Sequence, residues 1–536
     1  MSGLRVVLVV AIAGAMTAVS AETPGPDGLT EKGRLIYEAG QLGSGEPLVG
    51  HREGGLTSSG KAAACVACHQ RSGFGLFEGS NLVPPITGPS LFANARPIAH
   101  VPRRSKSVEH REFPFLNRPA YNDTTLATAV REGLSPGGHR FQFLMPRYAL
   151  GDVDVKALTA YLRQLSAAPS PGASAQRISF ATVIAPGQDA GRRQAVIDVL
   201  RACFEERHPD RPGRQAWQLV TWDLEGAPAG WMTQLRSKYA EQPVFAVVSG
   251  LGTDEWAPVH HFCELEKIPC LFPNVDAVPE AAAGQYTFYF SKGVVLEAQV
   301  AGHYLTTKAS GLGIARVVQL WREAGSGARA AVALREALKA GGVPVEDRIL
   351  KGAEADGVQP AAAGLQRSDA LVLWLGQEDL RALASGAPPD VATIMLSGLL
   401  GGWERAPLAP AWKRASLMLY QLDAPTRRAA RMRFNLHPWL RGKAIAAADE
   451  VLLGNTLAAC NVLHEGVLRL RGAFFRDYLV EVTERYPSMG NAPAPQAYPR
   501  FTLGPGQRFS SLGAYVVRFK LPALDELELV RDWIIP

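Results

Sequence analysis

The chain has 536 residues, of which 47% are hydrophobic and 20% charged, and its formal net charge is +6. This length predicts roughly two to four domains, and the ordinary composition excludes a disordered chain and a bundle of membrane helices. The small net charge does not favour nucleic-acid binding, because no basic helix with interleaved aromatic residues accompanies it. The local basic run at 96–111 is interpreted as a solvated loop or as a docking patch for an acidic partner.

The N-terminus has the pattern of a secretory signal peptide. Arg5 precedes an apolar run at 6–19, and Val19-Ser20-Ala21 fits a small-residue cleavage site. The run is too short to span a bilayer well, and no charged stop-transfer flank follows it. Residues 1–21 are therefore predicted to be cleaved, and the mature protein is expected in the periplasm and not as a membrane-spanning protein.

The most informative segment is Cys65-Val66-Ala67-Cys68-His69, the attachment signature of a c-type haem. Two thiols at this spacing reach the two vinyl groups of the porphyrin, and the adjacent imidazole becomes the first axial ligand of the iron. The alternatives are a redox-active cysteine pair or half of a zinc site, but no second Cys-x-x-Cys is present. We predict one covalent haem c, attached through Cys65 and Cys68 and ligated by His69.

Met145 is the predicted second axial ligand. It is the sole methionine between the cleavage site and residue 231, and a thioether is a soft ligand that raises the reduction potential. The alternative is a core methionine that fills a gap. The next candidate ligand is His139, and three further histidines are interpreted as surface or structural residues: His51, His100 and His110.

Residues 22–165 are predicted to be helical, with glycine- and proline-rich loops and no convincing strand. Predicted helices lie near 30–40, 124–131 and 152–165, with Thr30 and Asp152 as the caps of the first and last. So few elements would make a poor core, and a bound porphyrin would supply the missing apolar centre.

This region resembles the class I c-type cytochrome domain. Besides the haem motif and Met145, the resemblance is carried by Gly33-x-x-x-Tyr37 and Leu158-x-x-Tyr161, which look like the family's contact between first and last helices. It implies an all-α fold in which the carbonyl of Pro84 or Pro85 orients the proximal histidine. The stretches 41–60 and 92–122 are longer than in minimal members, and they are expected to cover the haem edge or to form a partner surface.

A small, polar, proline-bearing segment at 166–176 is the predicted linker to a region of different texture, 177–536. There, strands and helices alternate, which predicts parallel sheets covered on both faces, and two such series predict two lobes. Strands are predicted at 178–185, 217–222, 244–248, 268–272, 315–320, 370–375, 391–396, 514–519 and 527–535, and helices at 190–207, 231–239, 260–266, 328–339 and 443–470.

The second region resembles the type I periplasmic solute-binding fold, in the branch that includes branched-chain amino-acid binding proteins of ABC-type transporters. The resemblance is carried by Ile268-Pro-Cys-Leu-Phe-Pro-Asn274, by 286–292 with its following helix, and by Trp533-Ile-Ile-Pro536. It implies a two-lobed α/β domain that closes on a small molecule in its cleft.

The predicted anion-binding turn of this cleft is Ser249-Gly250-Leu251-Gly252-Thr253, which follows a strand and offers free backbone N–H groups. Ligand contacts are assigned to Ser249, Gly250, Gly252 and Thr253, and the alternative is a plain strand-to-helix turn. On the second lobe, 321–323 and 376–377 are candidates by position.

Four further cysteines are expected to matter in an oxidising compartment. Cys263 and Cys270 could pair, which leaves Cys203 and Cys460 as a long-range pair or as two buried thiols.

The sequence thus predicts a multidomain protein, an all-α cytochrome c domain followed by a two-lobed α/β domain. The leading hypothesis is a periplasmic electron carrier, not an enzyme, whose α/β region binds a solute or a redox partner such as a dehydrogenase. The alternative is a solute receptor of an ABC-type transport or sensing system that carries a haem redox module. A haem peroxidase is the third hypothesis, but a di-haem enzyme would need a second attachment motif, and the chain has one.

Overall fold

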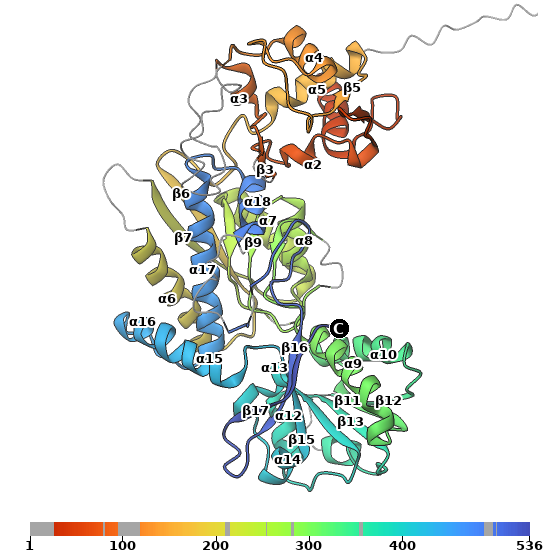
Figure 1. Ribbon diagram of the computed structural model, residues 1–536. Coiled ribbons are helices and arrows are strands. Elements are labelled where there is room, and N and C mark those ends of the chain that lie inside the picture. Colours follow the sequence, from red (N-terminus) through yellow and green to blue (C-terminus); the bar gives the residue numbers. More distant parts are fainter. Residues whose placement is uncertain are drawn as a thin grey trace, which may run out of the picture. The chain divides into compact units, whose positions relative to one another are not determined.

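The computed structural model describes residues 26–536 except 79–80, 95–117, 209–214, 253, 280–283, 353–356, 487–496 and 500. The predicted signal peptide and the basic run at 96–111 lie outside the described residues. The chain divides into two compact units, Met1–Ala167 and Ala168–Pro536, which are described separately (Figure 1).

Unit 1 combines short helices with short strands. The helices are α1 (Pro26–Arg34), η1 (Leu35–Ala39), η2 (Gly60–Ala62), α2 (Val66–His69), α3 (Gly88–Phe92), α4 (Asp123–Glu132) and α5 (Asp152–Gln164). The strands are β1 (Val49–His51), β2 (Thr57–Ser59) and β5 (Arg147–Tyr148), in an antiparallel sheet of order β2-β1-β5, and the hairpin β3 (Leu76–Glu78) and β4 (Asn81–Val83).

The expectation that this unit has no strands, and so is all-α, is therefore wrong. The strands have two or three residues each, too few to show the alternating pattern by which a strand is recognised in a sequence. Their pairing has a consequence for the site, because the extra stretch at 41–60 forms β1 and β2, and β1 pairs with β5 two residues after Met145.

The first and last helices of unit 1 cross at Gly33. A Cβ atom there would lie 2.0 Å from the carbonyl oxygen of Ala157, so only glycine allows this approach. The rings of Tyr37 and Tyr161 meet beside the crossing, with centroids 5.2 Å apart. The contact implied by the resemblance is present, but the first helix begins at Pro26 and not at Thr30.

The first lobe of unit 2 has a five-stranded parallel sheet of order β10-β9-β8-β6-β7. Its strands are β6 (Arg177–Ile184), β7 (Ala216–Asp223), β8 (Ala246–Val248), β9 (Cys270–Leu271) and β10 (Thr287–Phe288). Its helices are α6 (Ala190–Arg207), η5 (Pro228–Gly230), α7 (Trp231–Glu241), α8 (Ala257–Leu265), α17 (Glu450–Leu470) and α18 (Arg476–Glu484).

The second lobe has a seven-stranded sheet of order β12-β11-β13-β14-β15-β16-β17. Its strands are β11 (Arg316–Arg322), β12 (Val345–Leu350), β13 (Asp369–Trp374), β14 (Thr393–Ser397), β15 (Ser416–Tyr420), β16 (Ala514–Phe519) and β17 (Leu527–Ile534). Between β10 and α17 the chain forms the following helices: α9 (Val294–Leu312), α10 (Ser326–Lys339), α11 (Val358–Ala361), α12 (Gln377–Leu383), α13 (Gly398–Gly401), η7 (Trp403–Arg405), α14 (Pro410–Ala415), α15 (Pro425–Arg431), η8 (Met432–Leu436) and α16 (His437–Gly442).

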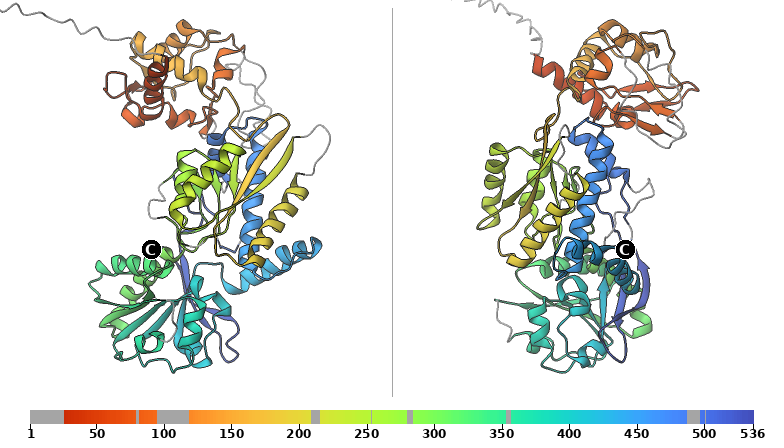
Figure 2. Two further views of the ribbon diagram at one scale, coloured as in Figure 1. Left: turned by 180° about the vertical axis from the view of Figure 1, so that it is seen from behind. Right: turned by 90° about the vertical axis from the view of Figure 1, so that its left-hand side faces the viewer.

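Both lobes are α/β layers with helices on the two faces of each sheet (Figure 2). The prediction of parallel sheets holds for the first lobe and for five strands of the second, whereas β16 and β17 are antiparallel. The predicted helix at 443–470 begins later, at Glu450, because Asp449 caps it by accepting a hydrogen bond from the Leu452 N–H.

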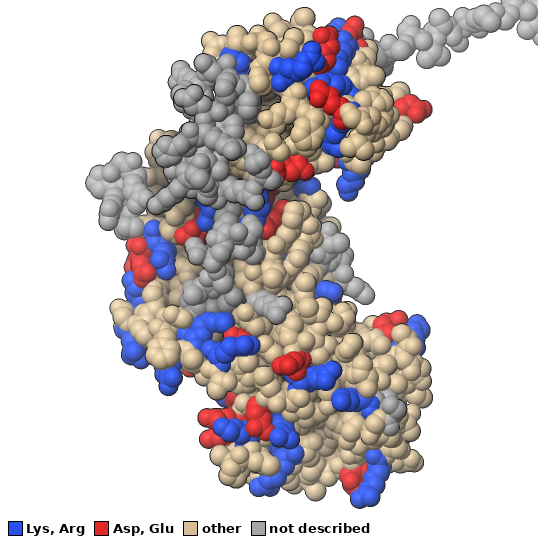
Figure 3. Space-filling view, in the orientation of Figure 1, with Lys and Arg blue, Asp and Glu red and all other residues tan. Residues whose placement is uncertain are grey.

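Helix α17 is long and apolar enough to cross a bilayer, but 78% of its most apolar window is buried inside the fold. It packs along α6, to which it is joined by the disulfide Cys203–Cys460. The second disulfide, Cys263–Cys270, joins α8 to β9. On the face shown in Figure 3, acidic and basic side chains are interspersed without a large patch of one sign, in line with the small net charge.

Candidate functional site

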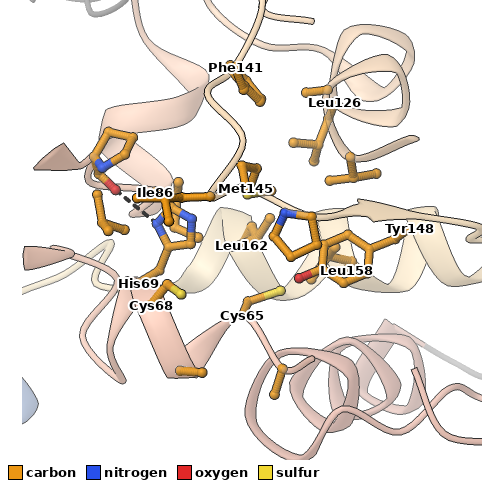
Figure 4. Close-up of a pocket in the computed structure, with 18 of the residues that line it drawn as sticks. Cys65, Cys68, His69, Ile86, Leu126, Phe141, Met145, Tyr148, Leu158 and Leu162 are labelled. Atoms are coloured by element: carbon orange, nitrogen blue, oxygen red, sulfur yellow. Dashed lines mark hydrogen bonds between the residues drawn. The ribbon is translucent and has the colours of Figure 1, made fainter. Parts of the chain in front are cut away.

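The core of unit 1 surrounds a cavity with an empty volume of about 1500 Å³, including its opening to solvent. Cys65, Cys68, His69 and Met145 all line it, so the structure brings the four predicted haem residues together (Figure 4). Most of the remaining wall is apolar and includes Ile36, Leu48, Ile86, Leu126, Val130, Leu158 and Leu162.

The His69 side chain is 6% exposed, and its Nδ1 lies 2.9 Å from the carbonyl oxygen of Pro84. Because a carbonyl can only accept, Nδ1 must carry the proton, and Nε2 keeps a lone pair for a metal ion. Burial lowers the pKa of His69 to about 4, and the hydrogen bond to Pro84 opposes this shift. Of the two prolines left open by the sequence, Pro84 is thus the one that contacts the histidine.

The backbone around His69 is held by specific contacts. The hydroxyl of Tyr37 donates to the carbonyl of Gln70 at 2.6 Å, and the N–H of Gly75 donates to the carbonyl of His69 at 3.0 Å. A Cβ at Gly75 would lie 2.1 Å from the carbonyl oxygen of Val83, so a larger residue would push this loop away from the histidine.

Cys65, which directly precedes α2, and Cys68, within α2, are free thiols three residues apart and therefore on one face of the turn. Burial raises the pKa of the Cys65 thiol to about 12 and also raises that of Cys68. Both side chains are therefore neutral groups at the cavity wall, beside the imidazole.

Met145 lies on a loop that two arginines fix in place. The Arg147 guanidinium donates to the carbonyls of Met145 and Phe141, and Arg52 donates from Nε to the carbonyl of Leu144 at 3.1 Å. No motif in the sequence marks these arginines. The one available signal is the position of Arg147 two residues after the predicted ligand.

These residues fit a haem c. The donors on offer are a neutral imidazole nitrogen and a thioether, the wall is apolar, and two unpaired thiols stand beside the imidazole. His139 also lines the cavity, whereas His51 lies in β1, where its Nδ1 is 3.2 Å from the Thr57 hydroxyl. His100 and His110 lie outside the described residues.

Unit 2 contains a polar cleft between its lobes, with an empty volume of about 1710 Å³ including its opening. The strands β8, β9, β13 and β14 end towards it, which is the usual place for ligands in parallel sheets. Its polar lining includes Gln188, Arg192, Asn274, Asp276, Ser291, Gln377, Arg405, Asp449 and Asn455.

The predicted turn after β8 contributes one residue, Gly252, to the lining of this cleft. Ser249 is 1% exposed and its hydroxyl accepts a hydrogen bond from the Asn274 amide at 3.1 Å. Gly250 packs against Trp256, where an added Cβ would lie 3.0 Å from the ring, and Thr253 lies outside the described residues.

On the second lobe, Gly376 and Gln377 line the cleft as predicted from their position. Arg322 instead forms an ion pair with Asp379. Sequence analysis missed Asp276, which follows β9 and belongs to no motif. Enclosure at the cleft raises the pKa of Asp276 to about 6, although Arg192 opposes the shift.

One wall of the cleft rests on a buried glutamate, Glu297 of α9. Its carboxylate accepts hydrogen bonds from the Ser397 hydroxyl at 2.5 Å and from the Leu399 N–H at 3.0 Å, and Leu399 lines the cleft. Burial raises the pKa of Glu297 to about 8, against the hydrogen bonds, which lower it. The folded protein therefore holds this proton at neutral pH, whereas the unfolded chain, with a pKa near 4.5, does not.

This difference predicts a pH-dependent stability of unit 2. Between the unfolded and folded pKa values the folded state binds more protons, so the free energy of unfolding should fall as the pH rises from about 5 to about 8. In Glu297→Gln, which has no titrating carboxyl group at this position, the free energy of unfolding should decrease by up to about 4 kcal/mol less over this pH range. Urea unfolding at several pH values measures it, with the exposed Glu336→Gln as control, and an unchanged slope in Glu297→Gln would contradict the assignment.

No family model and no curated protein matches the chain. Solved structures do match it. One is a possible leucine/isoleucine/valine-binding protein from Rhodopirellula baltica SH 1, with a TM-score of 0.51 and 16% identity; the match covers 67% of this chain and 98% of that one. A fatty acid ABC transporter substrate-binding protein from Thermomonospora curvata also matches (TM-score 0.50, 16% identity, 69% of this chain and 95% of that one).

A third match is the solute-binding protein of an ABC transporter from R. palustris in complex with benzoate, with a TM-score of 0.50 and 15% identity over 67% of this chain and 97% of that one. At such identities the likeness concerns the fold. About two thirds of the chain therefore has the two-lobed α/β fold of type I periplasmic binding proteins.

Proposed function

We propose that this is a periplasmic protein that binds a small molecule in the cleft of unit 2 and transfers electrons through a single covalent haem c in unit 1. The observation that carries the haem assignment is the convergence of Cys65, Cys68, His69 and Met145 on one apolar cavity. The binding assignment is supported by the fold of unit 2 and by its polar cleft.

When bound, a haem c exchanges one electron between its ferric and ferrous states. The residues of the chain have three tasks around it. Cys65 and Cys68 would hold it covalently, His69 would ligate the iron with Nε2 while Pro84 fixes the ring, and Met145 would be the second protein ligand of the iron. An iron ligated by both side chains would exchange electrons without binding a substrate, so the proposal is an electron carrier and not an enzyme.

The proposal is tested on the protein secreted by a host that attaches haem c. Its mass should exceed that of the cleaved polypeptide by one haem, and reduction should give the sharp visible bands of a low-spin haem. A colourless product with the mass of the bare polypeptide would contradict it. A redox partner, such as a periplasmic dehydrogenase, is then sought by haem reduction in mixtures with candidate enzymes.

A second candidate function is a solute receptor of an ABC-type transport or sensing system in which the haem reports the redox state. It is favoured by the three solved structures named above, two of which are described as parts of ABC transporters. A strain that lacks the gene distinguishes the two. Loss of uptake of the bound solute supports the receptor, whereas loss of electron flow from a periplasmic oxidation with intact uptake supports the electron carrier.

A further inference from the structure

The charged side chains that line the cleft of unit 2 differ in whether they have an ion-pair partner. Arg192 of α6 has its Nε 3.4 Å from Oδ2 of Asp449, and Arg405 of η7 has its Nη2 4.0 Å from Oδ1 of the same carboxylate. Arg405 also donates to the Ala448 carbonyl at 3.0 Å. The two guanidinium groups of the lining thus share one carboxylate of the chain, that of Asp449.

Asp276 differs from these arginines because its side chain has no such partner among the described residues. Among the described residues, its carboxylate has no hydrogen bond and no ion pair, although its backbone carbonyl accepts from the Val294 N–H. Its surroundings are enclosed enough to raise its pKa to about 6. A carboxylate that is partly withdrawn from water without a partner is costly to the protein unless something else donates to it.

Two unpaired amides extend this polar surface. The side chains of Gln188, from the first lobe, and Gln377, from the second, line the cleft and make no hydrogen bond with a described residue. Apolar surface is also present, in Leu399, Leu400 and Trp403. The described residues of the cleft therefore offer a small organic molecule an unpaired carboxylate, neutral amides and an apolar wall, whereas their two guanidinium groups are engaged with Asp449.

We infer that the ligand of this cleft is a small amine or alcohol without a carboxylate group, which donates hydrogen bonds to Asp276. This inference rests on the proposed binding function of unit 2. It differs in class from benzoate, the ligand of one structure with the same fold. Amines and alcohols both donate hydrogen bonds to a carboxylate, and the experiment below distinguishes between them.

The test uses sets of compounds with one carbon skeleton, titrated calorimetrically into the full-length, haem-loaded protein. One set is benzylamine, benzyl alcohol and benzoate, and another is 3-methylbutylamine, 3-methylbutan-1-ol and 3-methylbutanoate, with short diols added. The donor members of at least one set should bind more tightly than the matched carboxylate. Binding by carboxylates alone, or by no member of the panel, would overturn the inference.

The second arm is the isosteric variant Asp276→Asn, which removes the charge. Its affinity for the donor ligand should fall about tenfold or more, the usual weight of a hydrogen bond to a charged group. Asp390→Asn, at an exposed ion pair with Arg367, is the matched control and should bind as the natural protein does. Asp449→Asn keeps the helix cap, since asparagine also caps, but releases Arg192 and Arg405, so it should strengthen carboxylate binding.

The outcomes distinguish a failure of the role inferred for Asp276 from a failure of the proposed binding function of unit 2. If a carboxylate binds and Asp276→Asn leaves its affinity unchanged, the cleft is a binding site but Asp276 does not select the ligand. If neither the natural protein nor any variant binds a compound, both the inference and the binding function fail, while the haem assignment is still judged by mass and colour. If Asp276→Asn does not fold, the ranking of matched ligands on the natural protein decides.

Discussion

Replacing Cys65 and Cys68 together by alanine should yield a secreted protein without covalently bound haem. The two thiols are free, line the cavity and stand beside the imidazole of His69, so no described cysteine could take their place. The mass of the variant should equal that of the cleaved polypeptide, and denaturation with an acidic organic solvent should leave no colour on the chain.

The same variant should lose stability in unit 1. The cavity walls, including Leu126 and Leu158, would face an empty space where a porphyrin would otherwise supply apolar contacts. The melting transition of unit 1 should therefore fall, while that of unit 2 should stay.

Cys263→Ser with Cys270→Ser is the matched control for two cysteine replacements, because it removes a disulfide of unit 2 and leaves the haem motif intact. It should retain covalent haem. Equal haem content in the two double variants would show that the Cys-x-x-Cys-His segment is not the attachment site.

The proposed haem site follows from the sequence to the extent that its chemistry is local. Cys65, Cys68 and His69 are contiguous, and their spacing alone specifies an attachment motif. Met145 required a different argument, the scarcity of methionine in its region, and the structure places it on the same cavity. The choice between Pro84 and Pro85 depends on a single hydrogen bond, which no pattern of residues reveals.

The α/β unit was predictable where buried strands alternate with helices. The edges of α6 and β16, for example, agree with the expected ranges, because Asp189 caps the start of α6 and β16 is a short, mostly buried apolar run. β12 was missed because its sequence, Val345–Leu350, contains three charged residues and lies at a sheet edge. The antiparallel pairing of β16 with β15 follows the long connection 421–513 and has no local signal, whereas β17 returns beside β16 after the short segment 520–526.

The cleft was the least predictable part of the molecule. Its lining comes from segments that are far apart in the sequence, such as the loop after β9 with Asp276 and the short helix η7 with Arg405, and neither residue belongs to a motif. The turn after β8 was predicted to bind the ligand because of its glycines. Those glycines instead mainly allow close packing, as Gly250 does against Trp256. Glycine content signals a tight backbone, and the tight backbone here lies largely behind the binding surface.

Met145→Ala should keep the covalent haem but change its coordination. Alanine offers no donor atom, so the position opposite His69 would become open to water or to added imidazole. Oxidised protein should lose the weak long-wavelength band of methionine-ligated ferric haem, bind imidazole at far lower concentrations than the natural protein, and show a lower reduction potential, because a soft ligand no longer favours the ferrous state.

His139→Ala is the matched control, because His139 also lines the cavity but lies on the exposed part of the loop. If Met145 is the ligand, this variant should keep the band and the potential of the natural protein. If instead His139→Ala loses the ligand and Met145→Ala keeps it, the haem is bis-histidine-ligated, and Met145 is a packing residue. The expected result follows from the backbone: Arg147 donates to the carbonyl of Met145, and Arg52 donates to the carbonyl of Leu144. A ligand whose loop is fixed in advance loses little conformational entropy on binding the iron, which favours Met145 as the ligand.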